Sequence, residues 1–191
     1  MASQRTRAKT IKLDIACGQN KQKGHVGIDI AAIDGVDIVH DLNRYPWPIE
    51  TGSVREAFSS HYVEHIPMDL IADDGRRVDG MMTFMDELWR VCKDGAKVLI
   101  VHPYFKCERA FQDPTHRRFI TSATWHYFNR DWRKAQALDH YPVSCHFEIV
   151  AQTWSWFDDI SARASEYQQR AVLKDWDVIA DLYVHLKAVK T

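Results

Sequence analysis

The sequence predicts an α/β fold with a doubly wound, mostly parallel sheet. Two short apolar runs, residues 11–16 and 25–30, each carry a carboxylate near their end, and a turn at Gly18 follows the first run. Short apolar runs between turn signals are typical of buried parallel strands. A chain of 191 residues is long enough for one domain with a sizeable core. We therefore expect a single domain over residues 11–191, preceded by a flexible basic tail at residues 1–10.

Three more strands are predicted along the first half of the chain, at residues 36–40, 55–60 and 96–102. Between the last two, residues 69–92 have helical spacing, with a break near residues 73–77. The second half of this segment places apolar residues on one helix face: Met81, Phe84, Met85, Leu88 and Val91. A glycine at position 95 then ends the helix.

The second half of the chain is less regular. Residues 121–129 are predicted to form a helix, with Thr121 or Ser122 as its cap. Residues 145–157 and 179–190 have the alternating character of strands, and residues 160–173 have helical propensity. We expect the two strands to pair as an antiparallel hairpin at one edge of the sheet.

Composition narrows the class of protein. The chain is 46% hydrophobic and 27% charged, with a net charge of −1. These values argue against disorder, and against a protein that holds nucleic acid mainly by bulk positive charge. No apolar run is long enough to span a bilayer, and the basic start lacks the apolar segment of a secretory signal.

The four cysteines, at positions 17, 92, 107 and 145, form no Cys-x-x-Cys pair. This spacing indicates neither a zinc ribbon nor a thioredoxin-type redox site. Reduced, mostly buried thiols in a cytoplasmic protein are the expectation.

The turn after the first strand points to a nucleoside site. A glycine lets the backbone approach a ligand, and a carboxylate after the second strand can bind ribose hydroxyls. NAD, FAD and S-adenosylmethionine all contain such a nucleoside. The dinucleotide fingerprint requires Gly-x-Gly-x-x-Gly, but only Gly18 is present in Asp14-x-x-Cys17-Gly18-x-Asn20. A cofactor without phosphates therefore fits better than NAD or FAD.

Five blocks in order resemble the class I S-adenosylmethionine-dependent methyltransferases. They are Leu13-Asp14-Ile15-Ala16-Cys17-Gly18, Gly27-Ile28-Asp29, Asp41-Leu42, residues 60–66 and residues 87–95. The likeness covers about residues 11–105 and is strongest to a short, uncharacterised subgroup that includes phage-encoded members. It implies a Rossmann-like seven-stranded sheet, mostly parallel, with the antiparallel hairpin at its end. It also implies a short first crossover, in which residues 19–24 form a loop or a single turn.

The resemblance also implies which residues hold the cofactor. Gly18 and the backbone nearby would lie against the methionine portion and the ribose, and Asp29 would bind the ribose hydroxyls. Asp41 would face the adenine amino group, and Ser60 or His61 would line the methionine end. The full set is Asp14, Ala16, Cys17, Gly18, Asp29, Ile30, Asp41, Leu42, Ser60 and His61. Simpler roles stay open for some of them: Asp14 could only stabilise the turn, Asp29 could be a surface residue at the end of its strand, and Asp41 could be an ordinary turn former.

Catalytic candidates follow the fifth strand, because ligands bind at strand carboxyl ends in such sheets. His116 could act as a base, with Asp113 orienting it or binding substrate, and Tyr104 could cover the sulfonium by a cation–π contact. A structural role for His116, pinning an irregular loop, is the alternative. For Glu64 and His65 we favour a structural role. Asp113, His102 and His116 could in principle hold a metal, but no metal is predicted.

The expected function is methyl transfer to an oxygen or nitrogen of a small-molecule acceptor. Residues 11–105 would form the cofactor half and residues 106–191 the acceptor-side half. One alternative is a nucleotide or nucleic-acid methyltransferase that uses basic residues between 117 and 134. Two others are a catalytically idle S-adenosylmethionine-binding module and a nicotinamide-dependent oxidoreductase. No membrane partner is expected, and the oligomeric state is not predicted.

Overall fold

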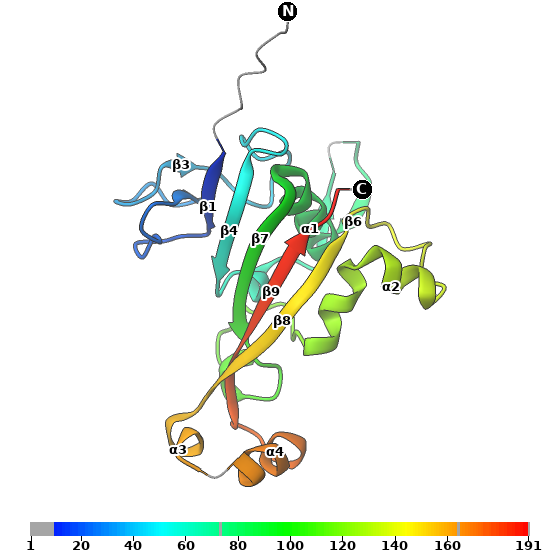
Figure 1. The fold of residues 1–191 in the computed structure, drawn as a ribbon. Coiled ribbons are helices and arrows are strands. Elements are labelled where there is room, and N and C mark those ends of the chain that lie inside the picture. The colour runs from blue at the N-terminus through cyan, green and yellow to red at the C-terminus, as the bar shows by residue number, and fades with distance from the viewer. Residues whose placement is uncertain (1–9, 73, 164, 191) are drawn as a thin grey trace, which may run out of the picture.

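The computed structural model describes residues 10–72, 74–163 and 165–190, so nearly all of the predicted basic tail lies outside the described residues. One sheet of seven strands, in the order β3-β2-β1-β4-β7-β9-β8, organises the molecule (Figure 1). The strands are β1 (Ile11–Ile15), β2 (Val26–Asp29), β3 (Ile38–Val39), β4 (Val54–Ser60), β7 (Cys92–Pro103), β8 (Phe147–Trp156) and β9 (Ile179–Ala188).

The sheet is parallel except at β9. The first five strands in spatial order pair in parallel, with Leu13 opposite both Val26 and Ala57 in the register. Strand β9 lies antiparallel between β7 and β8. The predicted mostly parallel sheet with an antiparallel terminal hairpin is therefore confirmed. Because β9 is the inner strand of that hairpin, β8 forms the edge.

The helical elements are short. They are η1 (Val63–His65), α1 (Gly80–Val91), η2 (Glu108–Ala110), η3 (Ser122–Phe128), α2 (Arg130–Ala135), α3 (Asp158–Ser161) and α4 (Ser165–Lys174). The helix predicted over residues 121–129 is a 3-10 helix, and the one predicted over 160–173 is two short helices.

The prediction of helix over the first half of residues 69–92 is wrong. This part forms a hairpin of β5 (Asp69–Ile71) and β6 (Arg77–Asp79), with Gly75 at a φ of +82° in the turn. The apolar residues there pair across strands instead of covering one helix face. Helix α1 begins only after Asp79, whose side chain caps it by accepting a hydrogen bond from Met82 N.

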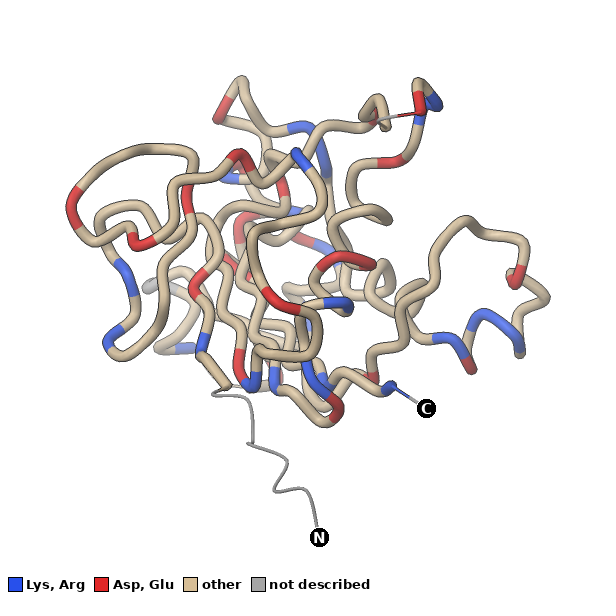
Figure 2. Tube along the Cα trace, turned by 90° about the horizontal axis from the view of Figure 1, so that it is seen from above, with Lys and Arg blue, Asp and Glu red and all other residues tan. Residues whose placement is uncertain are grey.

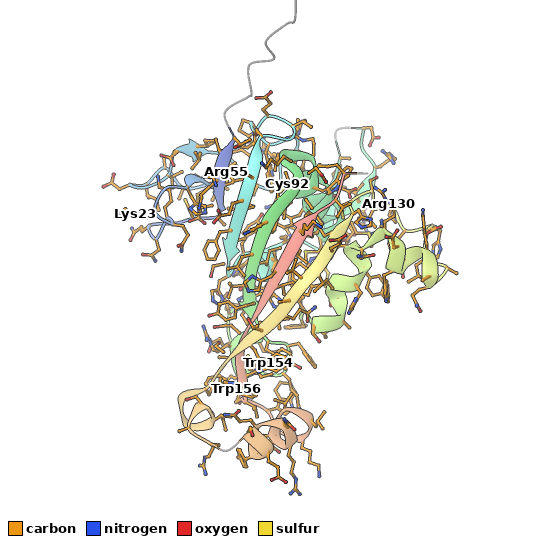
Figure 3. All side chains as sticks on the ribbon, viewed as in Figure 1. Lys23, Arg55, Cys92, Arg130, Trp154 and Trp156 are labelled. Atoms are coloured by element: carbon orange, nitrogen blue, oxygen red, sulfur yellow. The ribbon has the colours of Figure 1, made fainter. Side chains whose placement is uncertain are left out.

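The main core lies between the sheet and α1 with η3. Phe84, Met85 and Leu88 of α1 and Trp125 of η3 are fully buried there. Gly80 is required at the start of α1, because a Cβ at this position would lie 2.2 Å from the carbonyl oxygen of Pro67. A second, smaller cluster joins α3 and α4 to the end of β8, where Figure 3 shows Trp154 and Trp156.

No helix of the described residues covers the other face of the sheet. Residues 16–25 and 30–37, which connect β1 to β2 and β2 to β3, form no helix, so the predicted short first crossover is confirmed. Figures 1 and 3 look onto this face, with α1 behind the sheet. A groove of about 690 Å³ crosses it, with Phe58, Leu99 and Val150 among its lining residues.

Acidic and basic residues are interspersed along the trace (Figure 2). All four cysteines are free and buried, as predicted. Among the described residues, no helix has the length and apolar character needed to cross a bilayer.

Candidate functional site

The turn after β1 is joined to the end of β2 by the carboxylate of Asp29. Gly18 N donates to Asp29 Oδ2 at 2.9 Å, and Ala31 N donates to Oδ1 at 3.0 Å. Ala16 and Gly18 both have left-handed backbone, with φ of +55° and +50°. The carboxylate therefore lies against a tightly folded turn.

Asp14 lies beneath the same loop and is almost fully buried. Its Oδ2 accepts a hydrogen bond from Gln22 N at 2.6 Å. Burial raises the pKa of this carboxyl, and the Gln22 amide partly offsets that effect. Asp14 therefore stabilises the loop after β1, which is the simpler of the two roles we considered for it.

A group of buried polar atoms surrounds Asp41 after β3. Asp41 Oδ1 accepts from Asn43 N at 3.0 Å, and Leu42 O accepts from Trp47 Nε1 at 3.1 Å. Three side-chain atoms here are buried without a hydrogen-bond partner: Asn43 Oδ1, Tyr45 Oη and Tyr62 Oη. Burial raises the pKa of the Tyr62 hydroxyl, and the charges of Asp41 and Asp29 raise it further.

Tyr62 therefore lies within the field of both carboxylates predicted to hold a nucleoside. Unpaired buried polar atoms need a partner, and the polar edges of an adenosine would supply one. This arrangement fits the predicted cofactor. Sequence analysis overlooked Asn43, Tyr45 and Tyr62 as contributors, although Tyr62 stands inside one of the matched blocks.

Other members of the predicted cofactor set vary in exposure. Ile30 is 66% exposed, whereas Cys17 and Leu42 are buried. Ser60 ends β4 and is half-buried. Next to it, His61 has left-handed backbone with φ of +53°.

The His61 side chain lies between two buried carboxylates. Its Nδ1 is 3.3 Å from Glu64 Oε1, and its Nε2 is 3.8 Å from Asp181 Oδ1. Glu64 first, and then Asp181, raise the pKa of His61 against the opposing effect of burial. The tip of β4 thus meets the start of β9 through charged groups.

The loop containing His116 is fixed to η1 by backbone hydrogen bonds. Arg117 N and Arg118 N both donate to Glu64 O, at 2.7 and 3.2 Å. The rings of His65 and His116 consequently meet edge to face, with centroids 4.7 Å apart. His116 Nδ1 hydrogen-bonds to Ala110 O at 2.8 Å, so the imidazole also pins its own loop.

The hydrogen bonds of Asp113 go to Thr115 and not to the His116 ring, so the orientation of His116 by Asp113 stays a prediction. Asp113 Oδ1 accepts from Thr115 N and from Thr115 Oγ1, and the same hydroxyl contacts His65 Nδ1 at 2.9 Å. Asp113 is therefore linked to His65, because the turn that it forms places Thr115 between the two.

Tyr104 begins the loop after β7, half-buried, with its ring 4.8 Å from that of Phe105. His102 is fully buried at the end of β7: its Nδ1 pairs with Pro103 O, and its Nε2 lies 3.3 Å from Trp125 Nε1. Both His102 nitrogens are thus engaged, which leaves none for a metal.

Two of the cations suggested as phosphate ligands have structural roles. The Arg118 guanidinium donates to carbonyl groups of residues 66–68 and to Asp79. Arg133 is buried and donates to three carbonyl groups, of Tyr127, Val143 and Cys145. Neither side chain is available to a substrate in this arrangement.

Comparison with solved structures identifies the fold. A SAM-dependent methyltransferase from Archaeoglobus fulgidus aligns with a TM-score of 0.59 and 16% identity, over 94% of this chain and 86% of that one. The chain has the class I methyltransferase fold. A SAM-dependent methyltransferase from Methanosarcina mazei aligns with a TM-score of 0.54 and 14% identity, over 97% and 95% of the two chains.

The same architecture also occurs in the [4+2]-cyclase SpnF, with a TM-score of 0.53 and 11% identity over 96% of this chain and 76% of that one. Comparison with protein-family models and with curated protein sequences gives no match. Function must therefore be argued from the site, since one fold can carry different reactions.

Proposed function

We propose that this protein transfers a methyl group from S-adenosylmethionine to an oxygen or nitrogen of a small-molecule acceptor. The observation that carries the proposal is Asp29, held against the Gly18 turn with no glycine-rich phosphate cradle beside it. A carboxylate in this place suits the ribose of a nucleoside cofactor without phosphates. The class I methyltransferase fold supports the same assignment.

The residues of the cofactor half have distinct roles in this proposal. Asp29 binds the ribose hydroxyls, and Asp41 with Asn43 and the Leu42 amide faces the adenine. Ser60 and His61 line the methionine end, while Asp14, Ala16 and Cys17 shape the turn. When bound, S-adenosylmethionine supplies an already activated methyl group. The chain then mainly aligns the reactants and excludes water.

The acceptor side is formed by residues after β4 and β7. His116 is the proposed general base: its Nδ1–H donates to Ala110 O, which leaves the lone pair of Nε2 free to accept a proton. Tyr104 is proposed to cover the sulfonium. Asp113 has a positioning role in this proposal: it holds Thr115 and, through the Thr115 hydroxyl, His65.

An exposed aromatic group favours an acceptor with a planar ring. Phe111 and Phe119 stack with centroids 4.2 Å apart, and the ring of Trp176 lies 5.8 Å from Phe111. All three are about half exposed. Such a surface could stack a nucleobase, which keeps the nucleotide alternative open. The engagement of Arg118 and Arg133 weakens that alternative, because two expected phosphate ligands are lost.

Calorimetric titration with S-adenosylmethionine tests the proposal. Wild-type protein should bind it and should not bind NADH. Asp29→Asn removes the charge and keeps a carbonyl oxygen for only one of the two backbone amides that donate to Asp29. It should weaken binding at least about tenfold, since a hydrogen bond to a charged group contributes roughly 1.5–3 kcal/mol. The exposed Asp34 offers a matched control, and Asp34→Asn should bind like wild type.

Absence of heat with S-adenosylmethionine, or equal affinity in Asp29→Asn, would refute the cofactor assignment. Transfer of labelled methyl from the cofactor to fractions of a cell extract separates an enzyme from an idle binding module. His116→Gln should lower that transfer while leaving cofactor affinity unchanged.

A further inference from the structure

A cluster of three metal-ligating side chains lies beside the acceptor region. One ligand atom each of Glu64, His65 and His116 lies within 4.8 Å of the other two. Glu64 and His65 are on η1, and His116 is on the loop that the Glu64 carbonyl holds in place. The cluster is therefore built by the fold, and not by a chance meeting of surface side chains.

The Glu64 carboxylate is the first indication of a missing partner. Glu64 is 2% exposed, and both of its carboxylate oxygens are buried without a hydrogen bond. The neighbouring basic group is the His61 imidazole, whose Nδ1 lies 3.3 Å from Oε1 without making a hydrogen bond and which is a cation only when protonated. A buried carboxylate with unpaired oxygens is costly, and an ion is one of the partners that accounts for such a group.

The hydrogen bonds of both histidines indicate which nitrogen is free. His116 Nδ1 must carry a proton because it faces the carbonyl oxygen of Ala110. The Thr115 hydroxyl donates its hydrogen to Asp113, so its oxygen accepts a hydrogen bond from the Nδ1–H of His65. Each imidazole then carries its lone pair on Nε2. Metal-binding histidines usually have this arrangement, with the second ring nitrogen donating to a carbonyl or hydroxyl group.

We propose that the Glu64 carboxylate and the Nε2 atoms of His65 and His116 bind one divalent transition-metal ion of the zinc type. Two imidazoles and one carboxylate suit zinc better than magnesium or calcium, which prefer all-oxygen sites. Ligand atoms of a tetrahedral zinc site are roughly 3.3 Å apart, so the three side chains would have to draw closer when the ion binds. Three protein ligands leave one position for water or an acceptor oxygen.

Metal binding does not depend on the methyl donor, but the use of the fourth position rests on the proposed function. An acceptor oxygen bound there would lose its proton more easily, because the cation stabilises the negative charge. With the metal bound, His116 would act as a ligand and no longer as the base. Methyl transfer should therefore depend on zinc if His116 is a metal ligand, and should not depend on zinc if His116 is the base.

Calorimetric titration of chelator-treated full-length protein with zinc tests the site. We expect one equivalent to bind with micromolar affinity or tighter, and at least about tenfold weaker binding in Glu64→Gln and His116→Gln. Thr115→Val removes the hydroxyl that joins His65 to Asp113 but no metal ligand, so it should lose less affinity than either ligand variant. His140 is exposed and lies outside the cluster, so His140→Gln should bind like wild type.

Nitrogen chemical shifts of the histidine rings give a test that needs no variant. Zinc should shift Nε2 of His65 and His116 and leave their Nδ1 protonated. No binding, binding that survives both ligand variants, or shifts confined to other histidines would each overturn the proposal. Titration of the metal-free protein with S-adenosylmethionine tests the methyltransferase assignment separately. If the cofactor binds and zinc does not, only the metal proposal fails.

Discussion

His102 is a buried histidine whose two ring nitrogens both have partners. Its Nδ1 donates to Pro103 O, and its Nε2 accepts from Trp125 Nε1. This pairing requires the neutral imidazole, because a charged one would present a second proton to the indole N–H. Burial lowers the pKa of His102 below its usual value. The side chain is therefore a structural link between β7 and η3.

This neutral histidine predicts a stability change at mildly acidic pH. The unfolded chain binds a proton on His102 near pH 6.5, whereas the folded chain does so only at lower pH. Its contribution to stability is thus complete above pH 6.5 and is lost as the pH falls toward the folded-state pKa. The free energy of unfolding should decline by up to about 1.4 kcal/mol per pH unit in this window.

Urea unfolding of wild type and His102→Asn from pH 7.5 to 5 measures this decline. The asparagine amide can still donate to Pro103 O but does not titrate, so the difference between the two proteins should shrink as the pH falls. His140→Asn is the control for loss of an exposed histidine. Parallel pH profiles for wild type and His102→Asn would contradict the interpretation.

The element that sequence reasoning placed least well is the segment before α1. Leu70, Ile71 and Val78 satisfy a helical pattern but pair across the β5–β6 hairpin, because Gly75 permits a tight turn. Short apolar runs fit either structure, and tertiary contacts decide between them. Here Arg118, distant in the sequence, binds the carbonyl groups at 66–68 and the cap residue Asp79.

The contact between Gly80 and Pro67 predicts that alanine at position 80 lowers stability, although helix propensity alone predicts the opposite. Alanine favours a helix over glycine by up to about 1 kcal/mol. A Cβ at position 80, however, would lie 2.2 Å from a backbone oxygen. Gly80→Ala should therefore lower stability by about 2 kcal/mol, or a Tm shift of about 4–8 °C. A thermal melt with unchanged or raised Tm would show that Pro67 and the start of α1 are not packed this closely.

The whole molecule carries its core on one side of the sheet. Neighbouring residues of β7 demonstrate the asymmetry: Ile100 is fully buried, whereas Leu99 faces the groove on the other side and is only partly covered. The connections that could carry covering helices are the loops at residues 16–25 and 30–37.

A pair of substitutions on β7 tests whether that face is uncovered in solution. Ile100→Ala should destabilise the protein by about 2–5 kcal/mol, the usual cost for a buried aliphatic side chain. Leu99→Ala removes the same number of carbon atoms from the other face and should cost less than about 1.5 kcal/mol. Equal losses in urea unfolding would mean that another surface covers Leu99.

Much of the cofactor half was predictable because its signals are local. Strands β1 and β2, the turn at Gly18 and the carboxylate of Asp29 all belong to one short stretch. The order of apolar runs and turns also predicted the parallel sheet and its terminal hairpin. Such features depend on the backbone preferences and on the apolar or polar character of neighbouring residues. Both properties can be read directly from the sequence.

The acceptor side depended on contacts between distant segments. Asp113 and His116 are close in sequence, yet hydrogen bonding joins Asp113 to Thr115 and His65 and leaves His116 with Ala110. Glu64 and His65 looked structural in the sequence, and only the fold brings them to His116. The sequence by itself determined the strands of the main sheet, the turn at Gly18 and the carboxylate of Asp29 at the end of β2. The tertiary structure alone decided the Glu64–His65–His116 cluster, because its members meet through backbone hydrogen bonds between segments about fifty residues apart.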